Sequence, residues 1–506
     1  MKAKILGIIL TGMLWFVRSE SQGQSYAESA LLFSQTMPAG SARIQGMGGV
    51  QVALGGDYSV ALSNPAGLGL YNRSEVTFSP GFLNRMVSSA YFGNSFEESS
   101  TKLYIPGLSY VFHMPKDDGN FIGGSFAITH TVTNDFNSHT YYEGDNDQTS
   151  MIDYFIDRAF GFFETEFQER GGQFNTLQGL AYNTFLIGPQ TLLDPLAPAD
   201  EYFTDVGSIP FQKEDIVTSG KTNQWSFSYG MNYKDKYYFG FGLGLSNLRY
   251  ASTKLYDEDF TKYSDPFFNY FTLKENLKIS GTGLNFTIGT IIRPIDQFQI
   301  GLSFTTPTFY NLTENYDANM TASWKNFDYY GDGSTILSLE SAKTDVVVSE
   351  YRLLTPLKLN SGATFIWEYG IVSADIEYTN PRSARYSSKV SGVSFSPEND
   401  DIKNSFKATL NYRLGTEFRF KIFRVRAGYS FMANAFSGTD GDNHSTSVSG
   451  GIGIRLKNFH IDWALVSTQN KLTYVPYLFD NYNFPDPRVD QDVSRVNSLI
   501  TVGFSF

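Results

Sequence analysis

The amino-acid sequence predicts an all-β fold: a 14-stranded antiparallel transmembrane β-barrel with an N-terminal hatch plugging the lumen and a partly helical extracellular loop. Three observations predict it. Apolar residues recur at every second position in fourteen segments, the connections between segments alternate between short and long, and the last segment ends at the aromatic residue Phe506. Single-chain bacterial barrels have an even number of strands, as this count does.

The alternation is clearest around residue 240, where Phe239, Phe241 and Leu243 are interleaved with glycines. Because such strands face lipid on one side and the lumen on the other, mean hydropathy stays at −0.24 although 16% of the residues are aromatic. A helical membrane protein would need repeated runs of ~20 apolar residues. The predicted strands lie near residues 75–91, 103–113, 120–133, 222–233, 237–252, 277–293, 296–308, 352–368, 370–386, 404–420, 422–433, 445–457, 458–470 and 494–506.

The connections support the same fold, because a barrel with both ends in the periplasm has short turns at one rim and longer loops at the other. Tight connections are predicted at residues 115–119, 234–236, 294–295, 368–370, 421 and 457–458. Longer ones are predicted at residues 92–102, 134–221, 253–276, 309–351, 387–403, 434–444 and 471–493. The alternative, a secreted multi-domain β-sandwich protein, predicts no such alternation.

Both ends of the chain indicate export. Residues 1–24 have the layout of a signal peptide, with Lys2 and Lys4 before an apolar run. The C-terminal strand with its final Phe506 resembles the assembly signal of outer-membrane barrels. We therefore expect a multi-pass protein of the Gram-negative outer membrane, with both termini periplasmic, surrounded by outer-membrane lipids and recognised by the barrel assembly machinery through Phe506.

Several other classes are disfavoured. The formal net charge is −12 without a basic patch, which argues against nucleic acid. The absence of cysteine removes disulfides, thiolate metal sites and cysteine nucleophiles. The few histidines are not placed with a nucleophile and an orienting acid, so no catalytic residue is assigned and we expect no enzyme. No motif calls for a metal or a cofactor.

A barrel of this size is wider than one that its own side chains can fill, so it needs a plug or forms a pore. Residues 25–74 precede the first strand and are rich in glycine. They are predicted to form a hatch, and residues 75–506 the barrel. A dinucleotide-binding fingerprint is also glycine-rich, but Gln51 stands where the last glycine of that pattern belongs.

The hatch carries a family resemblance. Residues 41–50 (SARIQGMGGV), Asp57 and residues 63–68 (SNPAGL) resemble the hatch of the FadL/TodX family of hydrophobic-compound transporters. The matching residues are Gly46, Gly48, Gly49, Asp57, Asn64, Pro65, Ala66 and Gly67. Residues 283–307 and the sequence Thr355-Pro356-Leu357 also look like hairpins of the family. A simpler interpretation of Asn64-Pro65-Ala66 is a turn that Pro65 fixes and Asn64 caps.

The resemblance implies a monomeric barrel that passes long-chain fatty acids or aromatic hydrocarbons by passive diffusion, with a lateral opening in the wall. A local break in strand pairing would provide that opening, and Gly123-Gly124 is a plausible position for such a kink. Similar barrels such as PorV of the type IX secretion system bind partner proteins instead. This is the alternative function.

The large loop, residues 134–221, contains two apolar stretches. Residues 152–167 have apolar side chains at three-and-four spacing, which predicts an amphipathic helix, and residues 177–187 form the second stretch. The two either pack on each other over the barrel mouth or leave an apolar groove in which a ligand first binds. That groove would be formed by Phe155, Phe160, Phe163, Phe167 and Phe185.

Overall fold

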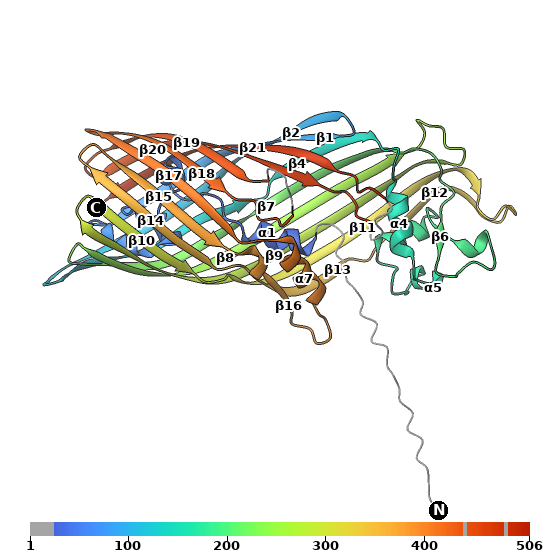
Figure 1. Ribbon diagram of the computed structural model, residues 1–506, viewed down its shortest axis with the longest axis horizontal. Coiled ribbons are helices and arrows are strands. Elements are labelled where there is room, and N and C mark those ends of the chain that lie inside the picture. Colours follow the sequence, from blue (N-terminus) through green and yellow to red (C-terminus); the bar gives the residue numbers. More distant parts are fainter. Residues whose placement is uncertain (1–24, 439–442, 480–483) are drawn as a thin grey trace, which may run out of the picture.

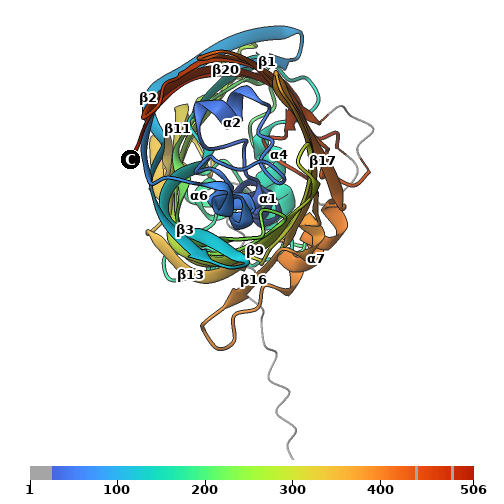
Figure 2. The ribbon, with the colours of Figure 1, turned by 90° about the vertical axis from the view of Figure 1, so that its left-hand side faces the viewer.

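The computed structural model describes residues 25–438, 443–479 and 484–506, and within them the chain forms a closed antiparallel barrel (Figures 1 and 2). The predicted signal peptide, residues 1–24, lies outside the described residues. The barrel closes because β21 (Val489–Ser505) pairs with β1 (Glu75–Tyr91), from Glu75↔Ser505 to Ala90↔Asp490. The prediction of fourteen antiparallel strands is confirmed in the described part of the chain.

We call each crossing of the barrel wall a wall strand, and four of the fourteen consist of two consecutive β-segments that share neighbours. In chain order the wall strands are β1, β2 (Asn94–Asp118), β3 (Phe121–Asp135) with β4 (Ser138–Asp145), β7 (Phe211–Tyr233), β8 (Tyr237–Asp259), β9 (Phe268–Ile295), β10 (Phe298–Thr305) with β11 (Phe309–Asp328), β13 (Val347–Leu354) with β14 (Lys358–Trp367), β15 (Gly370–Thr379) with β16 (Arg385–Ser388), β17 (Thr409–Phe420), β18 (Phe423–Met432), β19 (Ser445–Arg455), β20 (Phe459–Tyr474) and β21. The short strand β12 (Ile336–Lys343) pairs with the upper part of β11.

The alternation has the expected physical cause. On β8 the side chains of Phe239, Phe241 and Leu243 are exposed, whereas Gly240 and Gly242 face the lumen and are buried. Exposed apolar side chains recur on the outward faces of the other wall strands and form an apolar belt around the barrel, as a bilayer requires. In the part of the chain that the structure describes, no helix is long and apolar enough to cross a membrane.

The prediction of a loop at residues 92–102 is wrong. β1 and β2 meet in a two-residue turn, in which Phe92 and Gly93 have φ values of 41° and 85°, and β2 starts at Asn94. The outward side chains here lie beyond the apolar belt, where they can be polar, so the hydrophobic alternation that marks a strand is weak. For the same reason β11, β12 and β13 occupy much of the predicted loop at 309–351.

Within residues 25–74, four helices lie inside the cylinder, where Figure 2 shows α1 and α2. They are α1 (Tyr26–Ser34), α2 (Ala42–Gly46), α3 (Val60–Ser63) and the 3-10 helix η1 (Pro65–Leu70). We call residues 25–74 the luminal segment. Every residue from 39 to 54 is buried.

The connection between β4 and β7 is partly helical. It contains α4 (Met151–Ala159), α5 (Glu164–Phe167), α6 (Leu177–Asn183), β5 (Gly188–Pro189), η2 (Gln190–Leu192) and β6 (Tyr202–Phe203). The single helix predicted over residues 152–167 is broken, because Gly161 adopts a φ of +88° between α4 and α5. α4 and α6 pack on each other over the barrel mouth, as the closed arrangement predicts.

The last irregular region lies between β15 and β17. It contains η3 (Pro381–Ser383), β16 and α7 (Ser396–Ser405). The predicted strand over residues 404–420 therefore begins only at Thr409, because residues 396–405 follow Pro397 into a helix. Figure 2 shows α7 outside the ring of wall strands and β16, which pairs with β13, at the edge of that ring.

Candidate functional site: the occupied lumen

The luminal segment lies directly on the inner face of the wall, and glycines make this approach possible. A Cβ atom on Gly240 would come within 2.2 Å of the backbone nitrogen of Ala66, and one on Gly428 within 2.0 Å of the backbone nitrogen of Gly48. Real Cβ contacts do not occur at such distances. Wall glycines whose Cβ would come within 3.0 Å of the luminal segment are Gly107, Gly230, Gly240, Gly289, Gly301, Gly362, Gly415 and Gly428, one on each of eight wall strands. We call this set the glycine seat.

Asn64-Pro65-Ala66 lies on the seat. The Asn64 amide donates to the carbonyl oxygens of Val52 (2.6 Å) and, on β9, Thr290 (3.2 Å). Its Oδ1 accepts from the backbone N–H of Ala66 at 3.2 Å and so caps η1, in which Pro65 occupies the first turn. The tripeptide is thus a capped turn and a contact with the wall at the same time.

A buried carboxylate on β15 holds the middle of the luminal segment. Asp375 accepts hydrogen bonds from the backbone N–H groups of Gln51 (2.7 Å) and Val52 (3.0 Å). Within the segment, Asp57 accepts from the hydroxyl of Ser41 at 2.6 Å and from the backbone N–H of Ser59 at 3.0 Å. These bonds fix the fold of the segment as well as its position.

Arg43 supplies an ionic link to β17, the strand next to β15. Its guanidinium lies 3.3 Å from Glu417 on β17 and donates to the carbonyl oxygens of Gly55 (3.2 Å) and Gly56 (3.1 Å). Glu417 also pairs with Arg426 on β18 at 2.8 Å. Removing one partner of a buried ion pair costs several kcal/mol because a charge is left uncompensated. This link is not predictable from the sequence, since Arg43 and Glu417 are 374 positions apart.

The glycines predicted for the hatch have separate local roles. Gly48 and Gly49 have φ values of +70° and +83°, a conformation that suits glycine, and form the turn after α2. A Cβ atom on Gly46 would lie 3.4 Å from the Cα of Gly451 on β19. Gly67 packs against Leu54 and Val60. All eight predicted hatch residues are buried in the luminal segment.

Above the glycine seat, little of the lumen is open. A cavity of about 90 Å³ lies between the luminal segment and the wall, lined mostly by polar side chains such as Gln224, Asn285 and Thr308. Lys358 reaches into this region and donates to the hydroxyl of Thr36 at 2.7 Å. A molecule that passes along the barrel axis would therefore have to displace the luminal segment.

Next to this cavity the lumen is filled by an aromatic and aliphatic core made by α1, the loop helices and inward side chains of the long strands. Of the five predicted phenylalanines, Phe155 and Phe167 belong to this core and Phe185 packs against it, whereas Phe160 and Phe163 lie outside it. Phe155 and Phe167 are fully buried, Phe185 packs against Tyr329 at 4.9 Å, and Phe160 and Phe163 are 61% and 53% exposed. They separate because the break at Gly161 turns the chain after α4.

Gly123 and Gly124 lie at an irregularity in β3, where Gly123 has a φ of +153° and the register with β7 shifts. Both glycines nevertheless pair with β2, opposite Pro115 and Met114, and with β7, opposite Asn232 and Met231. The wall is bent at this point and remains continuous.

No group of three or more potential metal ligands occurs among the described residues. The histidines are scattered. His139 lies between Glu98 (3.0 Å) and Asp215 (3.1 Å), His130 packs on Trp225, and His460 lies in the wall beside Glu75 and Asp462.

Comparison with known proteins identifies the fold. No family model and no curated protein matches the sequence. Solved structures match over nearly the whole chain. The toluene transporter TodX of Pseudomonas putida is 12% identical with a TM-score of 0.52, covering 94% of this chain and 100% of that one. A FadL homologue of Pseudomonas aeruginosa is 12% identical with a TM-score of 0.55, covering 94% and 99%.

A closed barrel with an apolar belt, an occupied lumen and these neighbours is a Gram-negative outer-membrane β-barrel. Its fold is that of the FadL and TodX channels, so the resemblance seen in the sequence is confirmed at the level of the fold. The first of these neighbours is a toluene transporter.

Proposed function

We propose that this protein passes hydrophobic small molecules across the outer membrane by passive diffusion, with residues 25–74 acting as the hatch. The observation that carries the proposal is the luminal segment itself, which blocks the barrel at the glycine seat and would have to shift for anything to pass. The shared fold with a toluene transporter and a FadL homologue supports an apolar ligand, either a long-chain fatty acid or an aromatic hydrocarbon.

The physical need is clear. Apolar molecules cross the charged outer leaflet poorly, whereas apolar contacts inside a barrel contribute ~0.8 kcal/mol per buried methylene. The aromatic core below α4 and α6 offers such contacts, and we propose that a ligand is first captured there, near Phe155, Phe167 and Phe185. The exposed Phe160 and Phe163 would meet it on the outside.

The test uses liposomes that contain the pure protein and radiolabelled toluene or long-chain fatty acid. The hatch can be locked, because Ala42 of the luminal segment packs against Ala464 of β20 and both side chains are fully buried. The chain has no cysteine of its own, so the Ala42→Cys/Ala464→Cys variant has a single thiol pair that can form a disulfide across this contact. Uptake is expected in the reduced variant and not in the oxidised one.

Equal uptake by the oxidised and reduced forms would show that the hatch is not in the path. Uptake by the native protein no higher than that of an unrelated barrel would reject the transport proposal. Oxidised native protein is the matched control, since it cannot form the disulfide.

A second candidate, binding of a partner protein, is favoured by apolar side chains on the extracellular surface. Leu196 is 92% exposed, and Leu193, Val346 and Val348 are each about 60% exposed. Cross-linking in intact cells tests it, because one stoichiometric protein partner would favour a PorV-like anchoring role.

We also infer that the barrel functions as a monomer in contact with outer-membrane lipids and that Phe506 is the assembly signal. Phe506 is exposed at the rim of short turns, and its backbone pairs with Ser74. The predicted periplasmic N-terminus falls on residues outside the described part of the chain.

A further inference from the structure

Three neighbouring wall strands are interrupted at the same level. β10 and β11 are separated by residues 306–308, β14 and β13 by residues 355–357, and β15 and β16 by residues 380–384. The pairs Thr305↔Lys358 and Lys358↔Thr379 show that the three breaks lie side by side. Each contains a proline, Pro307, Pro356 or Pro381, which cannot donate to a strand ladder. Beyond this level β16 leaves the cylinder (Figure 2).

The next wall strand, β17, does not extend far enough to pair with β16. β17 begins at Thr409, opposite Thr379, and its place above that level is taken by α7. On the side away from β16, the end of α7 and the residues after it make little backbone pairing with the chain that follows β18. The contacts there are the isolated bridge Phe406↔Phe436 and backbone bonds from Lys407 to Ala435 (2.8 Å) and from Ser437 to Ser405 (2.7 Å).

On the edge of β16 that faces α7, the side chain of Asn399 bonds the backbone groups of Tyr386. The Oδ1 of Asn399 accepts from the backbone N–H of Tyr386 at 2.8 Å, and its Nδ2 donates to the carbonyl oxygen of Tyr386 at 3.0 Å. An amide of α7 thus takes the place of a neighbouring strand. Two hydrogen bonds of net ~1 kcal/mol each are a weaker closure than a continuous ladder.

Aromatic contacts pass through this part of the wall. Tyr26 of α1 lies inside the barrel, and its ring contacts Phe395, the residue before α7, at 5.5 Å. Tyr26 also contacts Tyr351 (5.6 Å) and Tyr386 (5.2 Å). In the described part of the chain, α7 and not a strand stands between the lumen and the exterior at this point, and the four rings fill the gap in the wall, which we call the breach.

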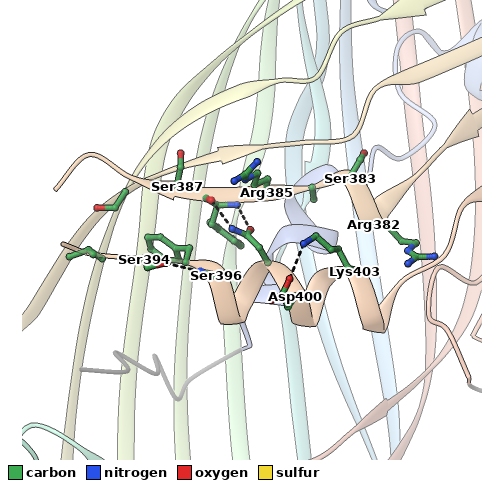
Figure 3. A pocket seen from close by; sticks show the side chains of 14 residues that line it. Arg382, Ser383, Arg385, Ser387, Ser394, Ser396, Asp400 and Lys403 are labelled. Atoms are coloured by element: carbon green, nitrogen blue, oxygen red, sulfur yellow. Dashed lines mark hydrogen bonds and ion pairs between the residues drawn. The ribbon is translucent and has the colours of Figure 1, made fainter. Parts of the chain in front are cut away.

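Beside the breach there is room for a ligand with a polar group. The hydroxyl of Tyr386 is buried and has no hydrogen-bond partner among the described residues, and such an unsatisfied group is costly. On the outer side a cavity of about 480 Å³ lies between β16 and α7. Figure 3 shows Arg385 and Ser387 on the β16 side of this cavity, and Ser394, Ser396 and Lys403 on the α7 side.

The cavity lies at the outer edge of the apolar belt. The last exposed apolar side chain on β15 is Tyr378, and the first on β17 is Leu410. α7 itself exposes Asp400, Asp401 and Lys403, which do not belong in hydrocarbon. An opening here would connect the lumen with the headgroup level of the outer leaflet.

We propose that α7 is a movable section of the barrel wall, and that a hydrophobic ligand with a polar end passes sideways between β16 and residues 433–437 when α7 and Tyr26 move apart. This inference rests on the proposed transport function and gives it a location. It differs from an opening at Gly123-Gly124, where the strands are paired on both sides. Because Tyr26 belongs to the luminal segment, hatch movement and wall opening would be coupled.

The first test ties α7 to β16. In the Ser387→Cys/Ser396→Cys variant, a reducible bis-thiosulfonate reagent joins the two sides of the cavity. Uptake of radiolabelled ligand is expected to fall to that of protein-free liposomes and to return when the cross-link is reduced. The control is Thr473→Cys/Asp490→Cys on β20 and β21, two exposed residues that already pair. Cross-linking this control should leave uptake unchanged.

Undiminished uptake by fully cross-linked Ser387→Cys/Ser396→Cys protein would overturn the wall-section proposal and leave transport intact. Absence of uptake before any cross-linking would reject transport itself.

A second measurement does not need transport. Ala30 is fully buried one helical turn from Tyr26 on α1, so a cysteine there reports opening of the breach. In the Ala30→Cys protein, adding Asn399→Ala should speed labelling by a maleimide carried on a lipid headgroup, because the edge of β16 is released. Equal labelling rates with and without Asn399→Ala would contradict the proposal.

Discussion

The two sides of this barrel differ in height. β7, β8 and β9 have 23, 23 and 28 residues, whereas β17, β18 and β19 have 12, 10 and 11. The long strands run out to α4 and α5 and enclose an aromatic core (Figure 1). The short strands are about as long as a bilayer needs, ~9–11 residues. The long strands therefore enclose a closed, core-filled region beyond the membrane. On the short side, α7 covers the stretch of wall that β17 does not reach.

The largest expected effect concerns the core on the long side. Phe155 is fully buried against Phe271, so Phe155→Ala should destabilise the extracellular part by ~3–5 kcal/mol. The matched control is Phe160→Ala, since Phe160 is mostly exposed. The temperature at which the protein loses its folded migration on gels measures both. Equal midpoints for the two variants would show that the long side does not depend on this core.

A smaller effect is expected where the luminal segment meets the wall. Gly240→Ala places a methyl group against the backbone of Ala66 and should cost ~1–3 kcal/mol through overpacking, which loosens the hatch. Gly450→Ala on the short side is the control, because its nearest neighbour would be 3.8 Å away. Liposome swelling in a small sugar measures the leak. A tight Gly240→Ala barrel would argue against the glycine seat.

The smallest effect is a pH dependence at the top of the long side. Glu258 lies on β8 well beyond Leu245, after which Asn247 and Arg249 replace apolar residues on the outward face. Its carboxylate accepts bonds from Met151 N–H and the Gln212 amide, both at 2.7 Å, and from Ser150 and Tyr256. Burial nevertheless raises the pKa of Glu258 from 4.5 to about 7.

Because the folded state holds this proton more tightly, it binds more protons than the unfolded state between pH 4.5 and about 7, and stability falls as pH rises through that interval. Proteolysis of the loop between β4 and β7 should therefore be slower near pH ~5 than near pH ~8. Glu258→Gln should remove most of the difference. A pH dependence that survives the substitution would assign it to another group.

The same comparison explains which parts were predictable from sequence. Wall strands are recognisable in the sequence within the apolar belt, where Phe239 and Leu243 must face lipid while Gly240 faces inward. Beyond the belt, outward side chains need not be apolar, so the sequence pattern predicts loops at the start of β2 and over most of β11 to β13. α7 was missed because its residues are mostly polar and the strand pattern of β17 follows closely. The alternating glycines of the wall strands can be recognised in the sequence. Their contact with the luminal segment cannot, since the two are up to hundreds of residues apart. Asp375 and Glu417 were hidden for the same reason.

The seam of the barrel has one more consequence. Ser74 exchanges two backbone hydrogen bonds with Phe506, at 3.2 and 3.0 Å, immediately before β1 begins. The luminal segment is thereby tethered to the chain terminus at a single point of the periplasmic rim. In the proposed hatch movement, the front end would swing out while the rear end stays anchored, as in a hinged flap. The segment would then return to the same orientation without having to find its binding surface by diffusion.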